Sequence, residues 1–199
     1  VKALIIFSGA LTGLMMILVG TLTPTAMFVP SINSSPEILS LKTSWQIPSL
    51  LLCAMVCGPE SAFAASIAYL TIGLFYLPIF NGGGSIGYLL TPDFGFLVGF
   101  LPAALITGKL AAKTKKNNLI GLTLSAIYGL AIIHSTGILN LMIGSISSRW
   151  PEDFSELFLS YSLSPIFSQV LVCPAIAILA IILNNTNPVV DIKKITALL

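Results

Sequence analysis

The chain has 199 residues, of which 56% are hydrophobic and 8% are charged, and its formal net charge is +2. Nine basic and seven acidic side chains cannot cover the surface of a soluble domain of this length, where charged residues are usually about 25%. This composition, with a mean hydropathy of +1.00, predicts an all-α integral membrane protein and gives no sign of nucleic-acid binding.

Six apolar segments predict six transmembrane helices in a single domain, residues 1–199. The first has about the 20 residues that a spanning helix needs. It is longer than the roughly 7–15 apolar residues of a signal peptide, so we expect a mature helix. The second and third segments are shorter and are joined by a Gly58-Pro59-Glu60 turn. The predicted helices are residues 3–22, 46–57, 61–77, 94–112, 119–143 and 165–183.

The lysines predict the orientation of these helices. With six spans, one side of the membrane holds seven lysines and the other holds only Lys42 and Arg149. Basic residues favour the cytoplasmic side, so both termini are predicted to be cytoplasmic and the Thr23–Trp45, Gly73–Phe100 and Gly144–Ser164 segments to face outward. The seven lysines are Lys2, Lys109, Lys113, Lys115, Lys116, Lys193 and Lys194.

The first helix contains a G-x-x-x-G pattern at Gly9 and Gly13, with Ala10 beside it. Small residues at this spacing let membrane helices approach closely. The pattern is compatible with packing inside the bundle and with docking onto another membrane protein.

The segment between the first two helices is rich in Pro, Asn and Ser, which disfavours helix and favours turns. Trp45 and Gln46 then lead into the second helix. Trp is common at membrane interfaces, so Trp45 is either part of an interfacial belt or, together with Gln46, a cap on a binding pocket.

The Gly73–Phe100 segment places polar and glycine residues between two apolar stretches. Irregular backbone at membrane depth occurs only where it is buried in protein or lines a cavity. The segment is therefore the first candidate for a ligand site. Its polar and glycine residues are Asn81, Gly82, Gly83, Gly84, Ser85, Gly87, Tyr88, Thr91 and Asp93.

Motifs for nucleotide chemistry are incomplete. Gly82-x-Gly84-x-x-Gly87 matches the dinucleotide fingerprint in letters but lacks a βαβ context. Gly108-Lys109 resembles the end of a P-loop, but Leu110 replaces the Ser or Thr that it needs. Without an ATPase motif, a catalytic set or a cluster of metal ligands, the sequence predicts that the protein is not an enzyme and binds no cofactor or metal.

Two further residue types have alternative explanations. Cys53 and Cys57 lie one turn apart and are interpreted, with Cys173, as packing thiols rather than metal ligands. His134 lies in the middle of the fifth predicted helix. An ionisable residue at membrane depth is a candidate functional group, but a neutral imidazole that bonds a neighbouring helix fits the sequence equally well.

The Gly73–Phe100 segment resembles the signature region of the BioY family of biotin transporters. The matching residues are Gly73-Leu74, Leu77-Pro78-Ile79-Phe80, Gly82-Gly83, Gly87, Leu90, Pro92, Gly95-Phe96-Leu97 and Gly99-Phe100. Ser44-Trp45-Gln46 and Gly58-Pro59 are also similar to family features. The resemblance covers about residues 3–112. Beyond it, Gln169 and Val172 stand where many members have an acid and a lysine that contribute to ligand binding.

This resemblance implies an S-component-like bundle that captures biotin and moves it across the cytoplasmic membrane. The implied partners are a transmembrane coupling protein and two ATPases of an energy-coupling factor (ECF) module, with Gly9, Ala10 and Gly13 as the docking surface. The alternatives are an S component for another vitamin or small carboxylate, and a non-transporting membrane assembly subunit.

Biotin chemistry suggests roles for the candidate residues. A buried ureido group needs both donors and acceptors, and the amides of Asn81 and Gln169 provide both. Trp45, Phe80 and Tyr88 are expected to flank the ligand rings, and Gly82, Gly83 and Gly84 to allow close backbone approach. Asp93 is either a ureido partner or a helix cap.

Overall fold

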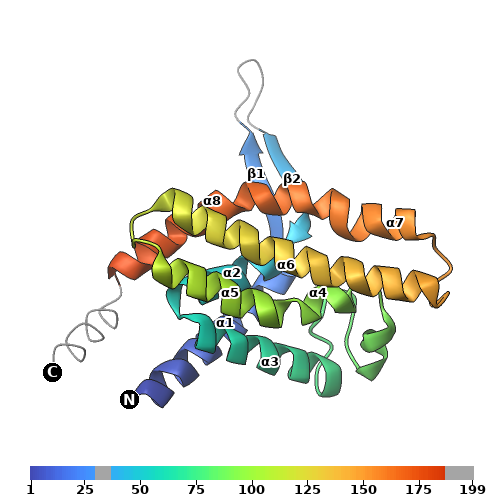
Figure 1. The fold of residues 1–199 in the computed structure, drawn as a ribbon, viewed down its shortest axis with the longest axis horizontal. Helices are drawn as coiled ribbons and strands as arrows, with labels where there is room; N and C mark the ends of the chain where they lie inside the picture. Colours follow the sequence, from blue (N-terminus) through green and yellow to red (C-terminus); the bar gives the residue numbers. More distant parts are fainter. Residues whose placement is uncertain (30–36, 187–199) are drawn as a thin grey trace.

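The computed structural model describes residues 1–29 and 37–186, with the backbone alone for residues 26–29 and 37–42. Within this part of the chain, six helical rods pack side by side (Figure 1). Part of the predicted loop and of the predicted charge asymmetry lies outside the described residues. The residues concerned are Pro30, Asn33–Pro36, Asp191, Lys193 and Lys194. The rods are α1 (Lys2–Leu22), α2 (Gln46–Val56), α3 (Pro59–Phe75), α4 (Phe94–Val98) continuing into α5 (Phe100–Lys113), α6 (Leu119–Ile146), and α7 (Phe154–Phe158) continuing into α8 (Ser164–Thr186).

The short helix α2 lies at the centre of the bundle, where it packs against α1, α3, α5 and α8. Nine of its eleven residues, from Gln46 to Met55, are buried. A helix of about 1.5 Å rise per residue and this length reaches only part of the way across a bilayer core. It is stable here because neighbouring helices cover it on all sides.

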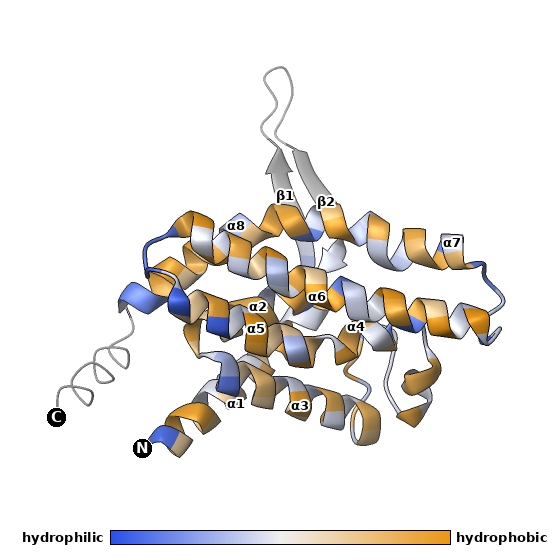
Figure 2. Ribbon diagram, viewed as in Figure 1, coloured by the Kyte–Doolittle hydropathy of each residue, from blue (hydrophilic) through white to orange (hydrophobic). Residues whose placement is uncertain are grey.

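In the described part of the chain, four rods are long and apolar enough to cross a membrane, residues 2–22, 94–113, 119–146 and 154–186. Apolar residues cover these rods along their length, while polar residues gather at the turns that join them (Figure 2). The protein is therefore a multi-pass membrane protein with the expected all-α fold. The number of helices agrees with the prediction, although α2 and α3 are shorter than the four long rods.

The glycines of α1 face into the bundle. A Cβ atom added at Gly9 would lie 2.6 Å from Ser61 Oγ, and one added at Gly13 would collide with Cys53 Sγ and lie 3.1 Å from Ala65 Cβ. The prediction that Gly9 and Gly13 form a docking surface is thus wrong, because both residues allow α1 to approach α2 and α3 closely. Ala10 is only partly buried. The exposed face of α1 contains instead Leu4, Phe7, Leu11, Met15 and Val19.

The segment predicted as a loop between α1 and α2 forms an antiparallel hairpin of β1 (Pro24–Val29) and β2 (Glu37–Ser44). The strands contain β-branched and aromatic residues such as Val29, Phe28 and Ile38, which favour extended backbone. The hairpin passes beside α8 (Figure 1). It ends at Ser44, and only Trp45 separates it from the buried Gln46 that begins α2.

The predicted loop over residues 144–164 is also more regular than expected. Helix α7 begins after Asp153, and its Leu157 is only 3% exposed because it packs into the bundle core. One π-helical turn, Leu159–Leu163, joins α7 to α8. A π-helical turn re-aims side chains and is frequent at functional sites; here it contains Ser160, Tyr161 and Ser162.

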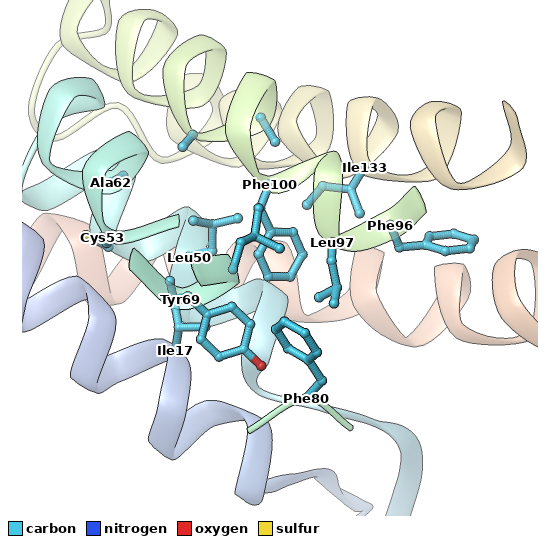
Figure 3. Close-up of a cluster of buried hydrophobic side chains, with 14 of the residues drawn as sticks. Ile17, Leu50, Cys53, Ala62, Tyr69, Phe80, Phe96, Leu97, Phe100 and Ile133 are labelled. Atoms are coloured by element: carbon cyan, nitrogen blue, oxygen red, sulfur yellow. The ribbon is translucent and has the colours of Figure 1, made fainter. Parts of the chain in front are cut away.

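A cluster of buried side chains fills the space between the rods (Figure 3). Tyr69 of α3 is fully buried and lies 5.4 Å, centroid to centroid, from Phe80 and 6.4 Å from Phe100. Edge-on and offset arrangements of this kind stabilise aromatic pairs beyond the area that they bury. Figure 3 shows that these rings come from three separate segments of the chain.

The close approach at Gly13 predicts that Gly13→Leu destabilises the protein by roughly 1–3 kcal/mol, the usual cost of overpacking. Thermal unfolding of the purified protein in detergent measures the effect. Ser8→Leu is the matched control, because Ser8 is exposed on the same helix and a leucine there needs no new space. Equal melting temperatures for the two variants would contradict the placement of Gly13.

Candidate functional site

A cavity of about 280 Å³ lies between α2, α4, α6 and the start of α8. This volume is close to the lower end of the roughly 300–1,000 Å³ typical of small-molecule sites. One part of its wall is apolar and aromatic, and the rest is polar but contains no Lys or Arg among the described residues. The lining residues are Thr43, Ser44, Gln46, Ile47, Asn81, Tyr88, Asp93, Phe96, Leu97, Phe100, His134, Ser160, Tyr161, Pro165 and Gln169.

Gln46 lines the cavity from the first turn of α2, and the fully buried Tyr69 holds its amide. Gln46 Nε2 donates to Tyr69 Oη at 2.9 Å, and Tyr69 Oη donates to the Ile79 carbonyl oxygen at 3.0 Å. Because the phenol has one proton and gives it to Ile79, Gln46 must be the donor in its own bond. The Oε1 atom of Gln46 is therefore the acceptor that this amide can offer to a ligand.

The segment between α3 and α4 folds onto the cavity through Tyr88, which lies in the 3₁₀ turn Ile86–Leu90. The Tyr88 hydroxyl donates to the Asn81 carbonyl oxygen at 2.9 Å and lies 3.5 Å from Asp93 Oδ2. Its ring centroid is 4.8 Å from that of Phe80. Tyr88 thus links Asn81 and Asp93, two of the predicted ligand residues, in one hydrogen-bonded wall.

The glycines of this segment shape a turn and do not line the cavity. Phe80 and Gly83 bond each other through both backbone groups, at 2.8 and 3.0 Å. Between them the backbone takes positive φ at Gly82 (93°) and Gly83 (137°), which glycine adopts without strain. Gly84 packs against the Pro78 backbone instead. The expected close approach of Gly82–Gly84 to a ligand is therefore not seen, because this turn needs the glycines for its own geometry.

Asp93 directs its carboxylate to the cavity. As the residue before α4 it uses only its backbone carbonyl to accept from Phe96 N at 3.0 Å, and its side chain makes no capping hydrogen bond. Burial raises the pKa of Asp93 to about 6, with the Tyr88 hydroxyl opposing part of this shift. The Asp93 side chain therefore does not cap α4, which was one of its two predicted roles.

Helix α6 contributes His134, and the π-helical turn and α8 supply its partners. His134 Nδ1 lies 2.9 Å from Ser162 Oγ, and His134 Nε2 lies 2.8 Å from Gln169 Oε1. The imidazole also meets the Phe96 ring edge-on at 5.6 Å. His134 is thus bonded to the neighbouring rod, as one of its two interpretations expected, and it lines the cavity as well.

Three hydrogen bonds, from two side chains, hold the part of the cavity wall that contains Asp93. Asn140 Nδ2 of α6 donates to the Pro92 carbonyl oxygen at 3.1 Å and to that of Thr91 at 3.3 Å. Trp150 Nε1 donates to the Leu90 carbonyl oxygen at 2.8 Å. These bonds attach the backbone just before Asp93 to the rod that contains His134.

Of the predicted site residues, the cavity brings together Gln46, Asn81, Tyr88, Asp93 and Gln169. Phe80 lies behind Tyr88 in the core, and Trp45 lines a separate groove against α1. Val172 is buried between helices and does not line the cavity.

Sequence reasoning did not select several lining residues, which are Thr43, Ser44, Ile47, Phe96, Leu97, Phe100, Ser160, Tyr161 and Pro165. In the sequence, the apolar lining residues cannot be distinguished from apolar core residues. Ser160 and Tyr161 reach the cavity only through the π-helical turn, which was not predicted. Within residues 1–29 and 37–186, no three side chains of the His, Cys, Asp and Glu types gather as metal ligands do.

Comparison with known proteins agrees with this architecture. The model of the BioY family matches residues 5–188. The probable biotin transporter BioY of Lysinibacillus sphaericus is 34% identical over 143 residues, covering 68% of this chain and 69% of that protein. The biotin transporter BioY of Rhodobacter capsulatus is 30% identical over 132 residues, covering 63% of this chain and 66% of that protein.

A solved structure has the same fold. The S-component for biotin from an ECF-type ABC transporter superposes with a TM-score of 0.67 over 94% of this chain and 93% of that one, at 21% identity. Thermotoga maritima also has a similar protein, a biotin transporter BioY that is 33% identical over 57% of this chain and 67% of its own length.

The raised pKa of Asp93 predicts a pH-dependent stability. Because the folded state binds this proton more tightly than a carboxyl of pKa 3.8, the favourable contribution is complete below about pH 3.8 and is lost as pH rises through about 6. Asp93→Asn removes the charge at every pH. We therefore expect its gain in melting temperature over wild type to be larger at pH 7.5 than at pH 5.

Thermal unfolding in detergent at the two pH values measures this difference. Asp153→Asn is the matched control, because Asp153 is exposed before α7. A gain for Asp93→Asn that is the same at pH 5 and pH 7.5 would show that burial does not disfavour the ionised carboxylate.

Proposed function

The chain belongs to the BioY family, and on that premise we propose that it takes up biotin across the cytoplasmic membrane as the substrate-capturing S component of an ECF-type transporter. The observation that supports biotin most directly is the composition of the cavity wall. Three amides and one carboxylate, from Gln46, Asn81, Gln169 and Asp93, lie in one cavity with Phe96, Leu97 and Phe100. This is a combination of polar and apolar groups that a ureido ring fused to a thiophane ring requires.

The donors and acceptors of this wall can be matched to the ureido group. Biotin offers two N–H donors and one carbonyl acceptor. Gln46 Oε1 and the Asp93 carboxylate are acceptors on separate elements, and the Asn81 and Gln169 amides remain for the carbonyl oxygen, which can accept two hydrogen bonds. Since an unpaired polar group in such a site costs roughly 1–3 kcal/mol, a ligand that pairs all three is favoured over one that pairs two.

The charge of the wall suggests how the ligand is oriented. The described lining residues include the carboxyl of Asp93 and no Lys or Arg. An anion beside Asp93 is therefore unfavourable, and we expect the biotin carboxylate to lie away from Asp93. The apolar and aromatic lining then covers the thiophane ring and the hydrocarbon tail.

Transport against a gradient requires an energy source. The proposed partners are a transmembrane coupling protein and two ATPases of an ECF module. Since Gly9 and Gly13 face inward, the exposed apolar face of α1 replaces them as the proposed docking surface. We infer from the lysines of the α5–α6 turn and from Lys2 that this turn and the N-terminus face the cytoplasm, because basic residues favour that side.

A titration of the purified protein with biotin tests the ligand. We expect saturable binding and a rise in melting temperature, because a ligand that binds only the folded state stabilises it. Uptake of labelled biotin into cells that express the chain, and its inhibition by unlabelled biotin, tests transport. Uptake that excess unlabelled biotin does not reduce would point to another vitamin, and no ligand-dependent stabilisation would favour a non-transporting subunit.

Asn81→Ala is expected to weaken biotin binding by roughly tenfold, the loss of about one hydrogen bond, without lowering the melting temperature. Asn81 lies in an exposed turn and its side chain supports no other helix. Isothermal titration gives the affinity. Ile86→Ala is the control, because Ile86 is 59% exposed in the same segment and does not line the cavity. Equal losses in both variants would argue against a ligand contact at Asn81.

The docking proposal predicts that binding and transport respond differently to changes on α1. The double variant Phe7→Ala with Leu11→Ala changes two side chains that are 67% and 51% exposed. We expect biotin titration to match wild type and uptake into cells to fall. If uptake is also unchanged, this face does not dock the coupling protein.

A further inference from the structure

The chain has one histidine, His134, and both of its ring nitrogens have partners. The side chain is 3% exposed in the middle of α6. Nδ1 lies 2.9 Å from Ser162 Oγ, and Nε2 lies 2.8 Å from Gln169 Oε1. A polar group at membrane depth without a partner is costly. The connection between α6 and the α7–α8 rod is therefore stable only if each of its two hydrogen bonds has one donor and one acceptor.

The positions of the protons follow from what each atom can do. An amide oxygen only accepts, so Nε2 of His134 must donate to Gln169 Oε1. A neutral imidazole has one N–H, and Nδ1 therefore accepts from the Ser162 hydroxyl. With its oxygen engaged by His134, Gln169 has its two amide N–H groups left for the cavity that it lines.

We propose that His134 is a positioning residue that fixes Gln169 as a hydrogen-bond donor, so that this part of the cavity selects a ligand group that only accepts. Under the proposed function, on which this inference rests, that group is the ureido carbonyl of biotin. An aspartate at the same position would present an acceptor. The His134–Gln169 pair thus gives this site a hydrogen-bond donor at a position where an ionised acid would be an acceptor.

His134 can set this orientation because its own ring is held in place. A glutamine amide by itself rotates between two nearly equivalent orientations about its last bond. The imidazole is fixed by Ser162 on one side and by the edge-on Phe96 ring at 5.6 Å on another. Ser162 reaches it from the π-helical turn and is 2% exposed. These buried groups hold the imidazole ring in place, and its Nε2–H bond then keeps the Gln169 amide in one orientation before any ligand enters.

Imidazole ¹⁵N NMR tests the protonation state without any ligand. Since the chain has a single histidine, its two nitrogen signals are assigned without ambiguity in protein labelled on histidine. We expect the neutral form with the proton on Nε2. A proton on Nδ1, or an imidazolium at neutral pH, would overturn the proposal, because Gln169 would then not be held as a donor in the way described.

Binding selectivity tests the consequence for recognition. In 2-iminobiotin a C=NH group replaces the ureido C=O, and the resulting cyclic guanidine is cationic at neutral pH, so it presents donors where biotin presents an acceptor. Wild type is expected to prefer biotin by roughly tenfold or more. Gln169→Glu, whose second carboxylate oxygen faces the cavity as an acceptor, is expected to shift the preference toward 2-iminobiotin.

Variants of His134 distinguish positioning from packing. His134→Phe keeps an aromatic ring and removes both hydrogen bonds, so the ratio of the affinities for biotin and 2-iminobiotin should fall by roughly fivefold or more. His134→Gln provides a new N–H donor to Gln169 and should restore most of the preference. Ser135→Ala is the control, because the exposed Ser135 on the same helix bonds only the Ala131 carbonyl oxygen. Melting temperatures measured in parallel separate loss of fold from loss of selectivity.

The outcomes separate this inference from the function on which it rests. An unchanged preference in a folded His134→Phe variant would overturn the positioning role. If the Nε2–H form is found and wild type binds no biotin, Gln169 is still held as a donor and the proposed ligand is wrong. If wild type binds biotin but has the Nδ1–H form, the proposed function stands and the role of His134 does not.

Discussion

A polar atom inside this bundle is costly unless it finds a partner within the protein, because the surrounding lipid offers none. Two buried side chains satisfy this condition at the cavity. Tyr69 of α3 accepts from Gln46 and donates to the Ile79 carbonyl oxygen, and His134 of α6 connects Ser162 to Gln169. Each uses one end of a cavity-lining amide and leaves the other end for a ligand. The arrangement of donors and acceptors in the site is thus a consequence of satisfying hydrogen bonds in the core.

The close packing of the helices makes these bonds possible. Glycines lie where two rods meet, as at Gly13 against Cys53 and at Gly137 against the Phe96 ring. The second contact matters most for the site, because Phe96 is also the ring that meets His134 edge-on. A side chain at residue 137 would displace Phe96, and the imidazole would lose part of its support. Small residues therefore shape the cavity through packing, at positions that do not line it.

The cavity has one wall within the helical core and another on the segment before α4. Gln46 and His134 belong to long-range networks within the core, whereas Asn81, Tyr88 and Asp93 lie on the segment before α4 that Asn140 and Trp150 hold through backbone carbonyl groups. The half-buried carboxyl of Asp93, with its raised pKa, is an unfavourable group in this wall once it ionises. A site residue that lowers stability in the empty protein is common where function requires a polar group in an apolar place.

The sequence by itself determined the membrane class and the helical fold, because only 8% of its residues are charged and long apolar runs satisfy their backbone in lipid as helices. It also indicated Gln46, Asn81, Tyr88 and Asp93 as polar residues near apolar segments, and the resemblance to the family indicated Gln169. Only the tertiary structure decided that Gly9 and Gly13 face inward, that Gly82 and Gly83 form a turn, and that Trp45 lies outside the cavity. The direction of a side chain depends on which neighbours cover it, and periodicity cannot specify this. The pairing of His134 with Gln169 joins residues 35 positions apart through a π-helical turn that no local pattern predicted.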